Sequence, residues 1–291
     1  MRVCLLLLML VLPLQQARAV TFQASIEASH WEMEASRFSC RLRQEIPAYG
    51  VATFEHGAGA AVNFALTPIQ KQQITGRARL IAEAPPWRPG ASPLLLGVVH
   101  AEPGSGVLQV APTLAQSMLA ALHKGLIPTF NTDQWYGTPE LLKVGISVAN
   151  FQSAYDDYLE CVAGLLPVNY RQVARTAILF PSAQSELSAA IRQRLDLIAL
   201  YVNADDSVRT LYVDGHSDNL GRRLLNRDLS KQRAEVVTRY LVQQGVPADR
   251  IVTRYHGERY PVVPNNSAEN RARNRRVTVR LEREEGTEPG R

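Results

Sequence analysis

The side chains best suited to chemistry lie between positions 214 and 276, where acidic, basic and amide groups recur at short spacings. Asp218 carries a carboxylate and Arg233, fifteen positions later, a guanidinium. We expect the two groups to meet at the mouth of one pocket. Such a pair suits a zwitterionic ligand with an ammonium and a carboxylate on neighbouring atoms, because each ligand charge then faces its opposite. The simpler alternative is that Asp218 and Arg233 only pair with each other.

A helix is predicted over residues 230–244, with Ser230 as its N-cap and Arg233 in its first turn. A cation there opposes the helix dipole at a cost of about 0.3–1 kcal/mol. The position makes sense if the helix N-terminus and the guanidinium together hold a carboxylate. The loop that carries Asp218 follows a predicted strand over 208–214, and ligand groups commonly lie at the carboxyl end of such strands.

Neighbouring polar residues offer other chemistry. His216 and Asp218 could bind a metal, but two ligands do not make a complete metal site. Ser217 directly follows His216, which is poor geometry for a nucleophile and its base. The sequence therefore predicts no enzyme and no cofactor.

A run of basic residues follows near the C-terminus. Arg271, Arg273, Arg275 and Arg276 could form only a solvated charged face, and we expect this of Arg271 and Arg273. Asn274 and Arg276 are instead assigned to the site.

The elements that position these groups alternate along the C-terminal half. Strands are predicted over 173–180, 208–214, 251–256 and 275–282, and the first helix is capped by Ser182 or Ser185. The order β-α-β-α-β-β predicts an α/β sandwich with its helices on one face of a mixed sheet.

The half before residue 167 contains short strand-like runs separated by Gly and Pro, which predicts an antiparallel sheet or barrel. Two helices are expected to interrupt it, over 112–124 and 153–165.

The first residues of the sequence predict where the protein is exported, and changes in pattern along the chain predict its domain boundaries. An apolar run over 5–14 and the triplet Ala17-Arg18-Ala19 predict a cleavable signal peptide over 1–19, and hence export. No later segment has the roughly 20 apolar residues of a membrane helix, so we expect no spanning segment. The predicted domains are 20–166 and 167–283, with a disordered tail over 284–291.

Two cysteines remain after the signal, Cys40 and Cys161. An even pair in an oxidising compartment is expected to form one disulfide. A metal site is the weaker alternative, because no histidine cluster accompanies the cysteines.

Charge is distributed unevenly around the formal net charge of +5. Residues 170–291 carry 21 Lys and Arg against 15 Asp and Glu, whereas residues 20–169 carry nine against 12. The basic half favours anionic partners. Nucleic acid fits poorly because the arginines lack interleaved aromatic residues, and an anionic wall polymer fits an exported chain better.

Residues 170–283 resemble the OmpA-like peptidoglycan-binding domain. The resemblance rests on GHSDNLG (215–221), Asn226, LSKQRA (229–234), the GV-x-x-x-R-I step (245–251) and NRRV (274–277). It implies that Asp218 and Arg233 bind the diaminopimelate of the wall peptide. The residues that would shape the site around them are Ser217, Asn226, Leu229 and Arg276.

The N-terminal half resembles the periplasmic accessory proteins of sodium-driven polar flagellar motors. The matching segments are HWEM (30–33), IPAYG (46–50), PPWRPG (85–90), PTF (128–130) and FQS (151–153). The resemblance implies a T-ring component in the periplasm that binds the basal body and a T-ring partner such as MotX, and that retains stator units indirectly. Independently of the resemblance, the rigid aromatic groups of PPWRPG (85–90) and Trp135-Tyr136 are typical interface anchors, and the alternative is that half of them belong to the core and to turns. Two alternatives stay open: a general OmpA-like cell-wall tether, and a secreted wall-active hydrolase using His216 and Asp218.

Overall fold

The computed structural model describes residues 19–69, 74–88, 90, 92–101, 104, 106–137 and 141–284. The predicted signal peptide up to residue 18 and the tail from residue 285 lie outside the described residues. The chain packs as two compact units. One comprises Met1–Glu32, Leu42–Phe54 and Asn63–Tyr155, and the other Met33–Arg41, Glu55–Val62 and Asp156–Arg291. The predicted boundary after residue 166 stays a prediction.

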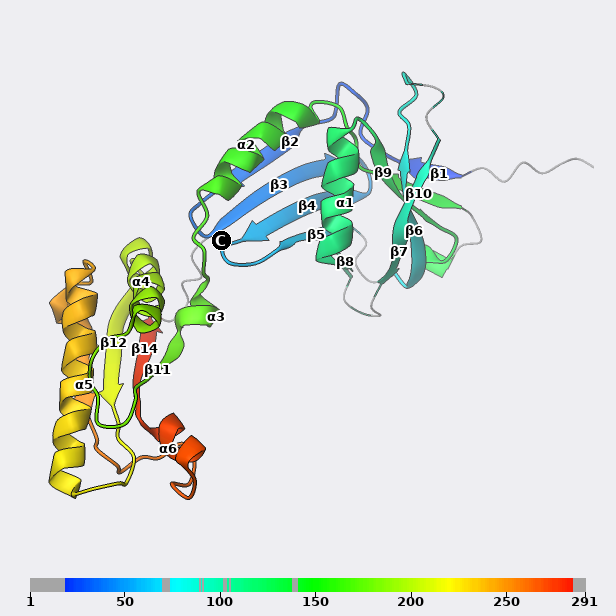
Figure 1. Ribbon diagram of the computed structural model, residues 1–291. Helices are drawn as coiled ribbons and strands as arrows, with labels where there is room; N and C mark the ends of the chain where they lie inside the picture. The colour runs from blue at the N-terminus through cyan, green and yellow to red at the C-terminus, as the bar shows by residue number, and fades with distance from the viewer. Residues whose placement is uncertain are drawn as a thin grey trace, which may run out of the picture. The chain divides into compact units, whose positions relative to one another are not determined.

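The N-terminal half contains two five-stranded sheets rather than one (Figure 1). The first has the order β1-β10-β9-β6-β7, in which β1 runs parallel to β10 and the other pairs are antiparallel. Its strands are β1 (Val20–Phe22), β6 (Gly76–Glu83), β7 (Leu94–Ala101), β9 (Ile127–Thr132) and β10 (Leu142–Gly145). The second has the order β2-β3-β4-β5-β8. Its strands are β2 (Trp31–Ala35), β3 (Ser39–Ile46), β4 (Gly50–Gly57), β5 (Val62–Pro68) and β8 (Leu108–Val110).

Both predicted N-terminal helices are present. They are α1 (Pro112–His123), which has Pro at its first turn, and α2 (Phe151–Ala163). A 3₁₀ turn, η2, covers Trp135–Gly137. The strand-like runs of the sequence cover residues 51–54, 61–66, 78–81, 94–99, 107–110 and 142–148. Four observed strands, β1, β2, β3 and β9, lie outside them. In β3 the buried Cys40, Leu42 and Ile46 alternate with polar residues, but the buried Gln44 interrupts the apolar pattern. In β9 every position is buried and Pro128 is present, so the segment lacks the alternation of a half-buried strand.

The predicted disulfide is confirmed. Cys40 on β3 and Cys161 on α2 are bonded, with their Cα atoms 5.9 Å apart and 121 positions between them in sequence. Cys40 is fully buried. The bond therefore fastens the last helix of the N-terminal half to a strand near its beginning.

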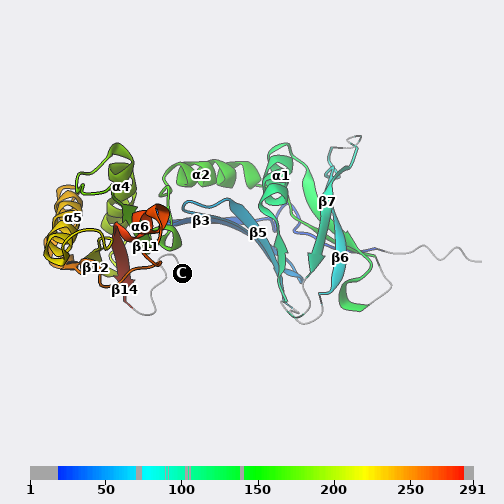
Figure 2. The ribbon, with the colours of Figure 1, turned by 60° about the horizontal axis from the view of Figure 1, so that its bottom comes forward.

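The C-terminal half forms the predicted mixed sheet. Its order is β11-β14-β12-β13, with β12 parallel to β13 and the other two pairs antiparallel. The strands are β11 (Arg175–Leu179), β12 (Val208–Gly215), β13 (Ile251–Tyr255) and β14 (Arg276–Arg283). The long helices α4 (Ala189–Ala204) and α5 (Arg223–Gln243) pack on one face of it (Figure 1 and Figure 2). Short helices complete the half: α3 (Tyr170–Val173), η3 (Ala248–Arg250) and α6 (Ala268–Asn274).

The core between this sheet and its helices is apolar. Leu195 and Ile198 of α4 and Val237 and Leu241 of α5 pack against inward residues of the strands. The inward residues of β14 are Val277, Val279 and Leu281, in the strict alternation that predicted the strand.

Two predicted helix starts are wrong. The helix α5 begins at Arg223, with Arg222 as an N-cap that makes no side-chain capping bond. Ser230 lies inside the helix, where its hydroxyl donates to the Arg227 carbonyl (2.7 Å) and accepts from the Gly257 amide (3.0 Å). Arg233 is therefore ten residues beyond the helix start, out of reach of the dipole effect that acts in the first turn. For α4 the cap is Ser188, whose side chain accepts from the Ile191 amide, rather than Ser182 or Ser185.

Candidate functional site

The site is built on the loop that leaves β12. Gly215 ends the strand against α5, and a Cβ atom there would lie 2.1 Å from the Ser230 carbonyl oxygen, so only glycine allows this close approach. The next residues are held through their backbone: the His216 amide donates to Arg276 O (2.8 Å) and the Ser217 amide to Gly257 O (2.9 Å). Asp218 follows in a fixed position, and its side chain is almost fully buried.

The cation that faces Asp218 is Arg275. Arg275 Nη1 lies 3.0 Å from Asp218 Oδ2, and both side chains are largely shielded from solvent. The other carboxylate oxygen, Oδ1, accepts from the Leu220 amide (3.2 Å). Arg275 is itself held by a bond from Nε to the Phe180 carbonyl (3.2 Å). A charge pair at this depth is screened less than a surface pair, and Arg275 is a site residue that the sequence analysis left unassigned.

Arg233 lies close to this pair, but its hydrogen bonds go elsewhere. Its side chain is 0% exposed. Nε donates to Gln184 O (2.7 Å), Nη2 to Pro181 O (2.9 Å) and Nη1 to His216 O (3.4 Å). Burial lowers the pKa of Arg233 to about 10; the nearby Arg275 charge also lowers it, while Asp218 opposes the shift. Arg233 thus stays charged at neutral pH and joins the 181–184 segment to the loop after β12.

Replacing Arg233 is expected to destabilise the fold. In an Arg233→Met variant three carbonyl oxygens lose their donor, and a buried polar group without a partner costs about 1–3 kcal/mol. We expect the free energy of unfolding, measured by urea denaturation, to fall by about 3 kcal/mol. Arg239→Met, at an exposed position of the same helix, is the control and should change little. Unchanged stability of the Arg233 variant would contradict this anchoring role.

Three further predicted residues surround the Asp218 loop. Asn226, in the first turns of α5, is buried and donates from Nδ2 to Glu258 Oε2 (2.8 Å). Ser217 is buried, and its hydroxyl has no hydrogen-bond partner among the residues that the structure describes. Leu229 is half-buried on α5. The structure thus leaves one hydroxyl beside Asp218 able to bond a ligand.

The remaining two predicted residues do not reach Asp218. Asn274 is fully buried, and its side chain bonds the backbone of Val262 and Val263 and the Asn265 side chain, so it holds a loop in place. Arg276 lies on the sheet face turned away from the helices and donates to Tyr260 O (3.2 Å). Arg275, the C-cap of α6, points to Asp218 and Phe180, whereas Arg276 opens β14 and points to Tyr260, so the two guanidinium groups have different surroundings. The geometry therefore favours Arg275 over Arg276 at the site.

Both halves of the chain match known protein families. Residues 22–167 match the family model of the MotY N-terminal domain, and residues 179–275 match the OmpA family. The sodium-type flagellar protein MotY of Vibrio parahaemolyticus serotype O3:K6 is 30% identical over 266 residues, which is 90% of each chain. The chain belongs to the MotY family.

Outside the MotY family the similarity covers less of the chain. The peptidoglycan-binding protein ArfA of Mycobacterium tuberculosis is 36% identical over 102 residues, 35% of this chain and 31% of ArfA. The crystal structure of the C-terminal domain of Helicobacter pylori MotB is 24% identical, covers 38% of this chain and 86% of that chain, and has a TM-score of 0.36. Neither family that matches this chain is an enzyme family.

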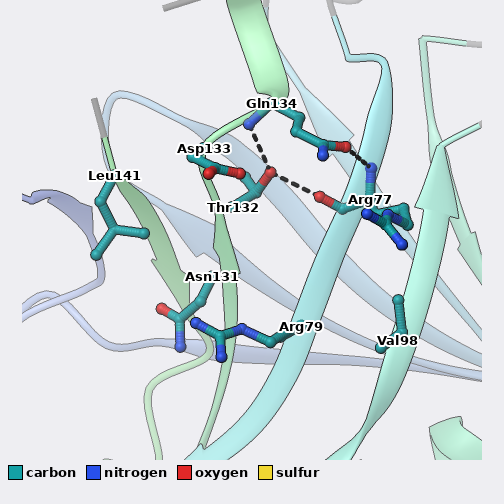
Figure 3. A pocket seen from close by; sticks show the side chains of 8 residues that line it. All are labelled: Arg77, Arg79, Val98, Asn131, Thr132, Asp133, Gln134 and Leu141. Carbon is teal, nitrogen blue, oxygen red and sulfur yellow. Dashed lines mark hydrogen bonds between the residues drawn. The ribbon is translucent and has the colours of Figure 1, made fainter. Parts of the chain in front are cut away.

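The MotY-type N-terminal half has a polar cavity of about 350 Å³ on its first sheet (Figure 3). Thr132 Oγ1 donates to Arg77 O (2.7 Å) and accepts from the Gln134 amide (3.0 Å), while Gln134 Oε1 accepts from the Arg77 amide (2.7 Å). Arg79 and the buried Asn131 lie beside each other in this view. Nothing in the sequence pattern pointed to this cavity.

The aromatic residues expected at a partner interface of the MotY half divide into two kinds. Trp135 is 1% exposed and packs near Phe130, with ring centroids 6.2 Å apart, so it belongs to the core. Trp87 is 52% exposed, and the neighbouring Arg88 donates to Lys124 O (3.0 Å). Of these two tryptophans, Trp87 is the one available as an interface anchor. No helix in the described part of the chain is long and apolar enough to cross a membrane.

Proposed function

We propose that this chain is a structural component of the flagellar T ring that lies in the periplasm, binds peptidoglycan and helps retain stator units. The observation that carries the wall-binding part is the Asp218–Arg275 pair, with Arg233 fixed beside it. Export would depend on the predicted signal peptide over residues 1–19. The name of the relative ArfA, which describes that protein as peptidoglycan-binding, supports the same role for the C-terminal half.

Diaminopimelate of the stem peptide has the chemistry that such a pair requires. Its free end carries an ammonium and a carboxylate on one carbon. The ammonium would lie against Asp218 and the carboxylate against Arg275, so the ligand exchanges one ion pair of the protein for two new ones. Arg233 adds positive potential behind the carboxylate, and Ser217 offers a hydroxyl without a partner among the described residues. No net charge is buried in the exchange.

The two halves would divide the work. Residues 20–166 would bind the basal body and a T-ring partner such as MotX, with Trp87 as one contact because exposed tryptophans are frequent interface anchors. Residues 167–283 would hold the assembly to the wall and, through it, the stator units. This division rests on the match to the MotY N-terminal domain over 22–167 and to the OmpA family over 179–275.

A truncated protein tests the division directly. Exported residues 20–166, with a fluorescent tag and expressed in a deletion strain, should reach the flagellar base yet restore little swimming. The full chain should restore both. The measurements are the position of the tag and the swimming speed. Full swimming with residues 20–166 alone, or localisation by residues 167–291 alone, would contradict the proposed division.

A further inference from the structure

The face of the C-terminal sheet opposite α4 and α5 carries charged groups that the proposed wall site does not use. A cavity of about 440 Å³ opens on this face, and its lining includes Arg175, His216, Arg276, Thr278 and Arg280. The strands β11, β14 and β12 bring these groups together, since Arg175 is paired in register with Arg280, and Arg280 with Tyr212. Arginines from two strands and a histidine from the end of a third thus border one hollow.

Part of this charge is already neutralised. Asp214 accepts two bonds from Arg254, from Nε (2.7 Å) and Nη2 (2.9 Å), and lies 2.8 Å from His256 Nε2. Arg280 pairs with Glu282 at 3.2 Å, where both side chains are substantially exposed. Asp214 is therefore shared by Arg254 and His256, and Glu282 offsets part of the charge of Arg280 at an exposed position.

Two guanidinium groups, those of Arg175 and Arg276, form no ion pair within 4 Å among the described residues. Arg276 donates to the carbonyls of Asn274 and Tyr260, which carry no charge. Burial lowers the pKa of Arg276, and the charge of Arg175 lowers it further, because the two cations repel each other; the nearby Asp214 carboxylate opposes the shift with a smaller effect. Such an arrangement creates a positive potential that a bound anion would relieve.

His216 adds a second, independent sign of a missing ligand. Its side chain is buried, and within the described part of the chain its Nδ1 atom has no hydrogen-bond partner. Burial, followed by the charge of Arg276, lowers the pKa of His216 to about 3, so the ring is neutral at physiological pH. A neutral imidazole can still donate one hydrogen bond. A buried polar atom left unpaired at the edge of a cationic hollow favours a ligand with acceptor oxygens.

We propose that this open sheet face binds a phosphate group, at a site separate from the Asp218–Arg275 pair. A doubly charged phosphate would neutralise Arg175 and Arg276 together. Its tetrahedral oxygens can accept from groups that converge from different strands, including Arg280 and the Thr278 hydroxyl. A planar carboxylate has one charge and two oxygens, so it would leave some of these hydrogen-bond donors without an acceptor. The phosphate could be free in solution or part of a lipid headgroup.

The test uses the mature full chain and inorganic phosphate at constant ionic strength, with sodium chloride as the reference salt. Phosphate should raise the melting temperature and bind measurably by calorimetry. An Arg175→Ala/Arg280→Ala variant should bind at least about tenfold more weakly, because it lacks two charged hydrogen-bond donors. An Arg194→Ala/Arg239→Ala variant removes the same charge from exposed positions of α4 and α5 and should bind like the unmodified chain.

Vesicles distinguish the two sources of phosphate. Sedimentation with vesicles of phosphatidic acid in phosphatidylcholine, lost in the Arg175→Ala/Arg280→Ala variant, would assign the site to a headgroup. Binding of inorganic phosphate without vesicle binding would assign it to a soluble phosphate. The proposal is overturned if neither binds, if acetate binds as tightly as phosphate, or if both double variants bind phosphate equally.

Discussion

An Asp218→Asn variant of the full mature chain is expected to bind diaminopimelate-type sacculi about 10- to 100-fold more weakly than the unmodified chain. The substitution keeps the shape of the side chain and removes its charge. It leaves Arg275 without its ion-pair partner and the ammonium of the ligand without a counter-charge. Loss of one partner of a buried charged bond costs about 1–3 kcal/mol, which corresponds to this range of affinity. Co-sedimentation with purified sacculi, at increasing wall concentration, measures the effect.

Two companion variants sharpen this test. Asp249→Asn removes the same charge from an exposed position of η3 and should sediment normally. Arg275→Ala should lose binding as Asp218→Asn does, and soluble diaminopimelate should compete with sacculi for the unmodified chain. Circular dichroism checks that each variant is folded. Normal sedimentation of a folded Asp218→Asn protein would remove Asp218 from the site, and full binding by Arg275→Ala would restore Arg276 as the candidate.

Loss of the Cys40–Cys161 disulfide is expected to have the largest effect on stability. The bond closes a loop with a sequence separation of 121 residues. In the chain-entropy model, closing a loop of this length stabilises the folded state by about 5 kcal/mol, because the cross-link lowers the entropy of the unfolded chain. A Cys40→Ala/Cys161→Ala variant should therefore unfold at a much lower urea concentration than the oxidised protein.

The control is the response to a reducing agent. Reduction should shift the urea midpoint of the unmodified chain towards that of the double alanine variant, and it should leave the variant unchanged. Alkylation of protein isolated from the periplasm gives a second check. Free labelling of both thiols before unfolding would show that the bond does not form in the cell.

The C-terminal architecture could be predicted because its signals are local. The alternation of Val277, Val279 and Leu281 identifies β14 from consecutive residues, and their burial confirms it. The start of α5 carried no such signal. Its first turns expose Leu224 and Leu225 to solvent, and the N-cap Arg222 makes no side-chain capping bond, so neither an apolar stripe nor a capping residue marks them. Ser230, a common capping residue, was mistaken for the start.

Other features depend on residues far apart in the sequence. Gln44 can be fully buried on β3 because its side-chain amide is satisfied by the backbone of Ser147. Nε2 donates to Ser147 O (2.9 Å), and Oε1 accepts from the Ser147 amide (2.8 Å). No neighbouring residue predicts that partner. The choice between Arg275 and Arg276 depends on the exact residue at which α6 ends and β14 begins, because Arg275 caps the helix and Arg276 opens the strand. Local patterns therefore located the site but did not identify its second cation.

The position of the disulfide also determines how the chain would respond to tension. Force applied between the N-terminal strand and the C-terminal half is transmitted along the covalent chain from Cys161 through the disulfide to β3. This force does not pass through the residues between Cys40 and Cys161. Without the bridge, the segment between Cys40 and Cys161, a sequence separation of 121, could extend to roughly 400 Å if the N-terminal half unfolds. Oxidation thus limits how far the chain can extend, because in an unfolded but oxidised N-terminal half Cys40 would still lie next to Cys161.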